Sequence, residues 1–305
     1  MGSPDLRELE CFLAVSEELH FGRAGERLLV SQSRVSQLVR SLERRIGTRL
    51  LDRTSRRVRL TPAGKDFLAE LAPAYAALRG AVDRATRASA QGVRGLLRVG
   101  FQGSAGAGFT AAVTAFRRER PDCAVEITEL PLADPFGAVR RGDVDTAVVL
   151  LPVVEEDLTL GLVFSRQPHY LAVAHHHPWS GAASVDAEQL AGTTLIDLAR
   201  TAPAYWRRAQ VPDRTPDGVP IPTGPEVRTL QEGLSLAAGG QGAMLLCRPT
   251  ADHHRREDLC YLPVTGLPDS ALGLVWRAGD ESAAVRGFAG ALAAAVRAAP
   301  GPARA

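Results

Sequence analysis

The segment Ser31–Gly47, SQSRVSQLVRSLERRIG, places apolar residues at every third or fourth position, as one buried stripe of an amphipathic helix does. This stripe consists of Val35, Leu38, Val39, Leu42 and Ile46. The opposite face consists of Arg34, Gln37, Arg40, Ser41 and Arg44. An ordinary solvated face mixes both signs of charge, whereas this one carries arginines and amides with almost no acid. A solvated surface is one interpretation of this face, and a surface that meets a polyanion is the other.

The residues around this segment predict a small helical domain with a basic hairpin. Residues 6–15 and 21–29 have the spacing of two short helices, and Ala24 is small enough for a close crossing. Ser31 is well suited to cap the third helix. This order predicts a helix-turn-helix. The following stretch RLLDRTSRRVRLT predicts a hairpin with a basic tip at residues 54–57, which would form a wing.

Thr61-Pro62 predicts the start of a longer helix, with Thr61 as N-cap. Its apolar residues follow the alternating three- and four-residue spacing of a two-stranded coiled coil. These residues are Leu68, Leu71, Tyr75, Leu78, Val82 and Ala85. Pro73 and Gly80 interrupt the pattern, so we expect a kinked or short coil. A helix packed on a core of the same chain is the alternative.

From Gly95 onwards, strand-like runs alternate with helical ones, which predicts a parallel or mixed sheet with crossover helices. About 210 residues are enough for two α/β lobes. The extended runs LTLGLVFS near residue 160 and LPDSALGLVW near residue 270 could carry the chain between the lobes and back. Ligands of such folds bind at the carboxyl ends of the strands, between the lobes.

Charge and cysteine usage narrow the class of protein. The net charge of +2 is unevenly distributed along the chain. Residues 1–91 hold 16 basic and 11 acidic residues, whereas the remainder holds 20 basic and 23 acidic residues. The positive charge is therefore concentrated in the N-terminal third. Four distant cysteines without a C-x-x-C pair favour a reducing compartment. We find no signal-peptide pattern and no membrane-length apolar run, and we expect a cytoplasmic protein with no membrane partner.

The chain resembles LysR-type transcriptional regulators over nearly fifty N-terminal residues, FGRAGERLLVSQSRVSQLVRSLERRIGTRLLDRTSRRVRLTPAGKDFL. The motifs GDVDTAVV, HHHPW and LAAGGQGAMLLCRPT continue the resemblance more weakly. It implies a chain of mixed α+β and α/β class: a winged helix-turn-helix (1–61), a linker or dimerisation helix (62–91) and a periplasmic-binding-protein-like effector domain (95–305). Within the effector domain, lobe I would comprise 95–164 and 268–300, and lobe II 165–267. The implied partners are double-stranded promoter DNA, a small-molecule effector and a second copy of the chain in a dimer or tetramer. RNA polymerase is a further candidate.

The sequence departs from the family's pattern in three places. Gly25 stands where the family has alanine, at a cost in helix propensity of roughly 1 kcal/mol. Ser33-Arg34 replaces the common Pro-Ala at the start of the third helix, so the DNA target cannot be taken from relatives. Pro73 interrupts the regular spacing of the predicted coil.

The resemblance places the third helix in the major groove, with its first turn against base edges. Arg34 would then contact a guanine and Gln37 an adenine, while Arg40 and Arg44 would contact phosphates. For any single residue, base contact and phosphate contact stay equal alternatives. The predicted DNA-binding residues are Gln32, Ser33, Arg34, Ser36, Gln37, Arg40, Arg53 and Arg56.

The loop GFQGSAGAGF predicts one side of an effector site, with Ser104 as a helix cap and donors aimed at the cleft. Thr201-Ala202-Pro203 predicts a second capped helix start on the other lobe. Two opposed helix N-termini with arginines nearby favour an anionic effector. For Ser104 a purely structural cap is an equal alternative, Thr128 is equally explained as a satisfied strand residue, and Arg228 points either into the cleft or into solvent. The predicted effector-binding residues are Gln102, Gly103, Ser104, Thr128, Arg200, Thr201 and Arg228.

The sequence does not favour nucleotide binding, metal binding, catalysis or solute transport. The glycine-rich loop lacks the G-x-G-x-x-G spacing and no Walker lysine exists, so we expect no cofactor. His175–His177 are consecutive and suit a surface turn better than a metal site. No catalytic motif is recognisable, so an enzyme is not expected, and a solute-binding protein would need a signal peptide. A ligand-independent DNA-binding repressor of the same fold is the alternative that stays open.

Overall fold

The computed structural model describes residues 5–53, 58–88, 95–104 and 106–298. The chain divides into two compact units, residues 1–82 and 83–305, which are described separately. Among the described residues, no helix combines the length and the apolar character needed to cross a bilayer.

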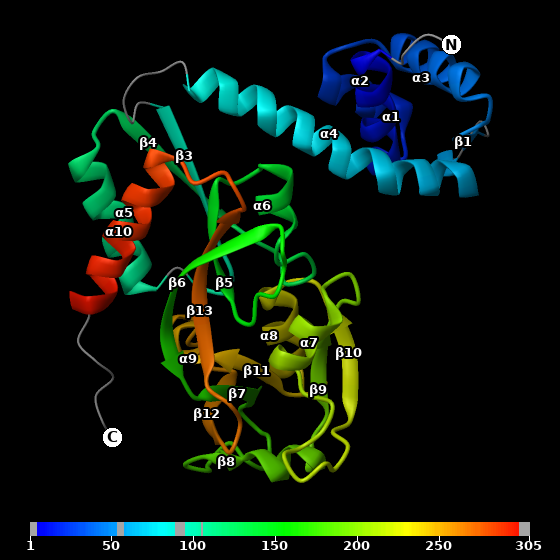
Figure 1. Ribbon diagram of the computed structural model, residues 1–305. Helices are drawn as coiled ribbons and strands as arrows, with labels where there is room; N and C mark the ends of the chain where they lie inside the picture. Colours follow the sequence, from blue (N-terminus) through cyan, green and yellow to red (C-terminus); the bar gives the residue numbers. More distant parts are fainter. Residues whose placement is uncertain (1–4, 54–57, 89–94, 105, 299–305) are drawn as a thin grey trace. The chain divides into compact units, whose positions relative to one another are not determined.

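The first unit contains three short helices, a two-stranded hairpin and the start of a long helix (Figure 1). In chain order these are α1 (Leu6–Glu18), α2 (Phe21–Leu28), α3 (Gln32–Ile46), β1 (Leu51–Arg53), β2 (Val58–Leu60) and α4 (Pro62–Ala88). The two caps predicted in this unit are confirmed, since Ser31 Oγ accepts from Arg34 N at 3.2 Å and Thr61 Oγ1 from Gly64 N at 3.0 Å. The helix-turn-helix and the strands of the wing therefore form as predicted.

A small apolar core holds the first unit together. Its fully buried residues include Phe12, Val15, Ala24, Val35, Val39, Leu42, Leu50 and Leu51. Phe67, Leu68 and Leu71 of α4 pack against this core. Gly64 permits that approach, because a Cβ there would lie 2.0 Å from the carbonyl oxygen of Leu50. The first turns of α4 thus belong to the core of this unit.

Lobe I of the second unit is built on a five-stranded mixed sheet in the order β4-β3-β5-β13-β6. The strands are β3 (Gly95–Phe101), β4 (Cys123–Glu129), β5 (Thr146–Leu150), β6 (Leu158–Gln167) and β13 (Ser270–Arg277). Its helices are α5 (Ala107–Glu119), α6 (Gly137–Arg141) and α10 (Ala283–Ala298). Helices α5 and α10 lie side by side (Figure 1), where Phe288 contacts the rings of Phe109 and Phe116.

Lobe II contains a four-stranded sheet in the order β11-β7-β12-β8 and a parallel pair of β9 and β10. The strands are β7 (His169–Ala174), β8 (Val185–Asp186), β9 (Leu195–Leu198), β10 (Thr223–Val227), β11 (Met244–Cys247) and β12 (Leu259–Thr265). The helices are the 3-10 helix η1 (Ala187–Gly192), α7 (Ala204–Gln210), α8 (Leu230–Ala238) and α9 (Arg248–His253).

Two strands carry the chain between the lobes, as the extended runs near residues 160 and 270 predicted. Strand β6 leads into β7 of lobe II, and β12 returns the chain to β13. Strands β6 and β13 pair antiparallel. A single cluster of buried apolar residues continues from lobe I into lobe II, where Phe136 meets Trp206 with ring centroids 6.4 Å apart.

Candidate nucleic-acid interface and effector cleft

Helix α3 is held by its apolar side and presents its basic side to solvent. Val35, Val39 and Leu42 are fully buried against the first unit's core. Six of the residues predicted to contact DNA belong to α3, and five of these six are exposed: Gln32, Ser33, Arg34, Gln37 and Arg40. Ser36 is half-buried. The cap at Ser31 fixes the first turn, which carries Ser33 and Arg34.

The arginines of α3 differ from those of α2 in their electrostatic partners. Arg23 lies 3.3 Å from Glu18, and Arg27 contacts Glu17. Within the part of the chain that the structure describes, neither Arg34 nor Arg40 forms an ion pair. Their charge is therefore available to an external anion, whereas the charge of α2 is balanced locally. This contrast argues against an ordinary solvated face for α3.

The far end of α3 is braced by two acidic side chains. Glu8 of α1 is 3% exposed and contacts Arg45 at 3.2 Å. Burial alone would raise the pKa of Glu8, but hydrogen bonds from Ser41 and Asp5, with the charge of Arg45, lower it. Glu43 Oε1 accepts hydrogen bonds from the backbone of Leu50 and Leu51 at 3.0 and 3.1 Å. The helix is therefore tied both to α1 and to the wing.

The wing strands pair in an antiparallel register that places Arg53 opposite Val58. Arg53 ends β1, and the predicted contact residue Arg56 lies outside the described residues, as does the rest of the tip. Arg59 on β2 is exposed and was not among the predicted residues. Its position in a basic hairpin is the sequence feature that could have indicated a DNA contact.

In lobe I, the loop after β3 does not have the predicted side-chain roles, which were a ligand donor at Gln102 and a helix cap at Ser104. Gln102 is 1% exposed, its Nε2 donates to Pro135 O at 3.1 Å, and its Oε1 accepts from Leu150 N at 2.9 Å. The side chain therefore braces lobe I internally. The predicted cap at Ser104 is wrong, because α5 begins after Gly106 and has no side-chain cap.

The second predicted cap is also wrong. Pro203 precedes α7 as its N-cap residue, and Thr201 Oγ1 instead donates to Ala133 O of lobe I at 2.7 Å. Ala133 N in turn donates to Arg228 O at 3.0 Å. The structure thus brings Thr201 and Arg228 to the loop that follows β4, which also accepts the hydrogen bond from Gln102.

The remaining predicted effector residues are more dispersed. Thr128 is exposed on β4 and lies opposite Gly100 in the sheet register, at the same sheet edge as the Gln102 loop. Arg200 is exposed and forms an ion pair with Glu226 at 2.6 Å. Arg228 is exposed and, among the described residues, forms no ion pair.

A small cavity of about 30 Å³ lies between the lobes. Lobe I contributes Gly103, Leu132 and Leu150. Lobe II contributes mostly apolar side chains: Ile196, Leu198, Gln210, Val211, Leu230, Met244, Leu245, Leu246, Cys247 and Thr250. This space accommodates about two water molecules. None of its lining residues is charged, and burial raises the pKa of the Cys247 thiol.

Helix α7 attaches the wall of this cavity to lobe I. Trp206 is fully buried, and its Nε1 donates to Leu150 O at 2.8 Å. Gln210 Nε2 donates to Leu151 O at 2.8 Å. Sequence reasoning missed these residues, because they bond to backbone carbonyls more than fifty residues away. Among the described residues, no group of three or more potential metal ligands is present.

Comparison with known proteins agrees with this architecture. Residues 6–65 match the family model "Bacterial regulatory helix-turn-helix protein, lysR family", and residues 90–297 match "LysR substrate binding domain".

Two bacterial regulators are similar in sequence. The uncharacterised HTH-type transcriptional regulator YnfL of Escherichia coli is 37% identical, over 63% of this chain and 65% of its own length. The HTH-type transcriptional regulator AlsR of Bacillus subtilis is 34% identical, over 65% of each chain. The alignments thus span just under two thirds of both relatives.

A full-length OxyR variant from Pseudomonas aeruginosa is similar in structure, with a TM-score of 0.58 and 25% identity over 98% of this chain and 96% of its own. With both of its parts matched by family models, the chain belongs to the LysR family of bacterial helix-turn-helix regulators.

Proposed function

We propose that this chain is a cytoplasmic transcriptional regulator that binds double-stranded promoter DNA and responds to a small molecule held between its two lobes. The proposed division is a DNA-binding domain (1–61), a linker helix (62–91) and an effector-binding domain (95–305). The observation that carries the proposal is the exposed basic face of α3, whose Arg34 and Arg40 form no ion pair with a described residue while the neighbouring Arg23 and Arg27 do.

On DNA, the first turn of α3 would read base edges. Arg34 offers two donors in the geometry that guanine accepts, and Gln37 offers the donor and acceptor that adenine needs. Arg40, one turn further on, would contact a phosphate and add affinity without sequence preference. Ser33 and Ser36 flank these positions, and Arg53 and Arg56 of the wing would meet the adjacent backbone or minor groove.

The effector would bind at the loops that surround the cavity between the lobes. Arg228 is exposed and close to the loop after β4, which supports an anionic group at that edge. The apolar lining of the cavity supports an apolar portion on the same molecule. Gly103, Ser104, Thr128, Arg200 and Thr201 complete the proposed site, and Gln102 supports it from within lobe I through its bonds to Pro135 and Leu150.

Self-association would use the second half of α4. Leu78 and Val82 continue the coiled-coil spacing and are 44% and 58% exposed. The relatives are named as transcriptional regulators, and we propose no catalytic activity. A ligand-independent repressor with the same DNA-binding domain is the second candidate, favoured by a cavity that holds only about two water molecules as it stands.

Two measurements on the full chain test the proposal. Selection from a random duplex library should enrich a recurrent half-site, and enrichment of no sequence would contradict DNA recognition. In a metabolite screen, an effector at 100 times its Kd should stabilise the protein by about 2.7 kcal/mol, which is visible as a shift in Tm. Sequence-specific DNA binding without any stabilising metabolite would favour the ligand-independent repressor.

A further inference from the structure

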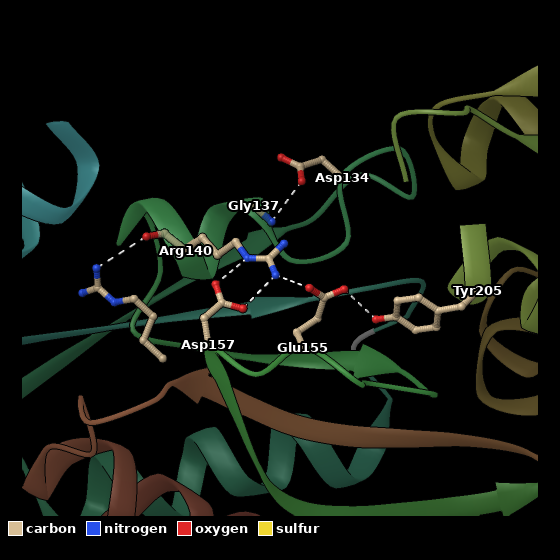
Figure 2. A network of polar contacts seen from close by, with 7 residues as sticks. Asp134, Gly137, Arg140, Glu155, Asp157 and Tyr205 are labelled. Atoms are coloured by element: carbon tan, nitrogen blue, oxygen red, sulfur yellow. Dashed lines mark hydrogen bonds and ion pairs between the residues drawn. The ribbon is translucent and has the colours of Figure 1, made fainter. Parts of the chain in front are cut away.

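A chain of four polar side chains joins lobe II to lobe I (Figure 2). Tyr205 Oη of α7 donates to Glu155 Oε1 at 2.8 Å, and the other oxygen of Glu155 contacts Arg140 of α6. Arg140 also binds Asp157 through two hydrogen bonds of 2.7 and 2.8 Å. Tyr205 comes from lobe II, whereas the three charged residues come from lobe I. We call Arg140, Glu155, Asp157 and Tyr205 the interlobe clasp.

The three side chains that lobe I contributes to the clasp are held in place by their own contacts. The hydrogen bonds from Arg140 lower the pKa of Asp157, and they hold the guanidinium between two carboxylates. Arg277 donates to the carbonyl of Arg140 at 3.4 Å and so supports the same helix from β13. Glu155 is only 17% exposed, which limits competition from water for its carboxylate. Tyr205 therefore meets an acceptor whose position is already set.

The hydroxyl of Tyr205, which lobe II contributes to the clasp, is protonated at neutral pH and can donate a hydrogen bond. Burial and the hydrogen bond to Glu155 raise the pKa of Tyr205 to about 12. The same helix carries Gln210, which lines the cavity, five residues further along the chain. A movement of α7 away from lobe I would break the Tyr205–Glu155 bond and withdraw one wall of the cavity together.

We propose that the interlobe clasp controls how readily the two lobes separate around the cavity, and thereby regulates access of the effector. This rests on the proposed function, in which the effector binds between the lobes. The cavity holds about two water molecules, so a larger ligand enters only when the lobes move apart. A hydrogen bond to a charged group changes an equilibrium constant by about ten- to a hundredfold, so its loss should raise the open population by about that factor.

Cys247 provides a native probe of this opening. Its side chain lines the cavity and is 6% exposed, so it reacts only when the lobes separate. Cys11 and Cys123 lie in the cores of the first unit and of lobe I, and they report unfolding of those parts instead. Cys260, which is half-buried on lobe II, reports the reactivity of a more accessible thiol.

The experiment measures alkylation of each cysteine in the full-length chain by N-ethylmaleimide, with peptide mass spectrometry at successive times. Tyr205→Phe keeps the ring and removes the donor. We expect its Cys247 to react at least about tenfold faster than in the native chain, with Cys11 and Cys123 unchanged. The matched control is Arg141→Gln, which removes a neighbouring arginine of α6 that pairs with Asp134 and Asp143, all within lobe I. Its Cys247 should react at the native rate.

Two outcomes would overturn the proposal. One is a Cys247 rate in Tyr205→Phe equal to that of the native chain and of Arg141→Gln. The other is a native Cys247 that reacts as fast as Cys260, since the lobes would then not protect it. If Cys11 or Cys123 also becomes reactive in Tyr205→Phe, Glu155→Gln replaces it as the test variant, under the same criteria. Because no DNA or effector is used, failure here leaves the DNA-binding part of the proposed function standing.

Discussion

Replacing both Leu78 and Val82 by aspartate should dissociate the dimer that we propose to form through α4. The stripe on this helix has two parts. Leu68 and Leu71 pack against the core of their own domain, and Tyr75 Oη donates to Glu10 Oε1 at 2.6 Å. Leu78 and Val82 continue the stripe and are 44% and 58% exposed. The first part therefore packs within the chain, whereas Leu78 and Val82 keep about half of their surface exposed to solvent.

The exposed area of these side chains gives the association free energy that the double substitution should remove. Burying a whole leucine or valine side chain is worth about 1.5–3 kcal/mol, and about half of each side chain is left to bury. Four such side chains meet in a dimer, which gives about 3–6 kcal/mol of association free energy. Four aspartates in their place add mutual repulsion. The dimer Kd should therefore rise by at least about a hundredfold.

Sedimentation velocity over a range of protein concentrations measures this change. Leu29→Asp is the control, because Leu29 is 92% exposed in the turn before α3 and its φ of 55° is one that aspartate tolerates. The control should associate like the native chain. A double variant that keeps the native far-UV spectrum and the native dimer would refute the assignment of α4 to the subunit interface.

Two further changes test the lobes. His169, at the start of β7, is 7% exposed, and burial lowers its pKa although the charge of Asp269 opposes this. Its contribution to stability is present above pH 6.5 and is lost as pH falls through the lowered pKa. His169→Gln should therefore flatten the decline in Tm below pH 6.5, and an unchanged decline would contradict this. Thr201→Val should lower the free energy of unfolding by about 1 kcal/mol, because the bond to Ala133 is lost. Ser104→Ala should leave it unchanged, since Ser104 caps no helix, and equal denaturation curves for the two variants would contradict this difference.

Local patterns in the sequence were sufficient for most of the fold. The three- and four-residue spacing of α3 places Val35, Val39 and Leu42 in the core, as predicted. The caps at Ser31 and Thr61 depend only on neighbouring residues, and both form. The strand-like runs of the second unit likewise become β3, β4, β5, β7, β11, β12 and β13.

Predictions failed where a side chain's partner lies far along the chain or where a helix begins later than expected. Ser104 and Thr201 resemble caps, but α5 and α7 begin two or more residues further on, after Gly106 and Pro203. Gln102 resembles a ligand donor, but its amide is used by Pro135 and Leu150. No sequence spacing signals that Tyr205 will meet Glu155.

Gly25 is a further case in which a contact in the folded chain is not visible in the local sequence. Helix propensity alone suggests a cost of roughly 1 kcal/mol relative to alanine. In the structure, a Cβ at Gly25 would lie 2.7 Å from the carbonyl oxygen of Val30. The absence of a side chain therefore lets α2 pack closely against the turn that precedes α3, an effect that propensity does not include.

The base preferences of single variants test most directly whether α3 reads DNA. In vitro selection and salt-dependent affinities should be compared for the native chain, Arg34→Ala and Arg40→Ala. Arg34 is exposed and only its backbone N–H takes part in the cap, so the substitution leaves the helix intact.

We expect Arg34→Ala to lose about 1–3 kcal/mol of specific affinity and to relax discrimination at one base pair of each half-site. Arg40→Ala should weaken all sequences equally and reduce the slope of log affinity against log salt by about 1. A base-preference profile that is unchanged in Arg34→Ala would contradict the placement of α3 in the major groove.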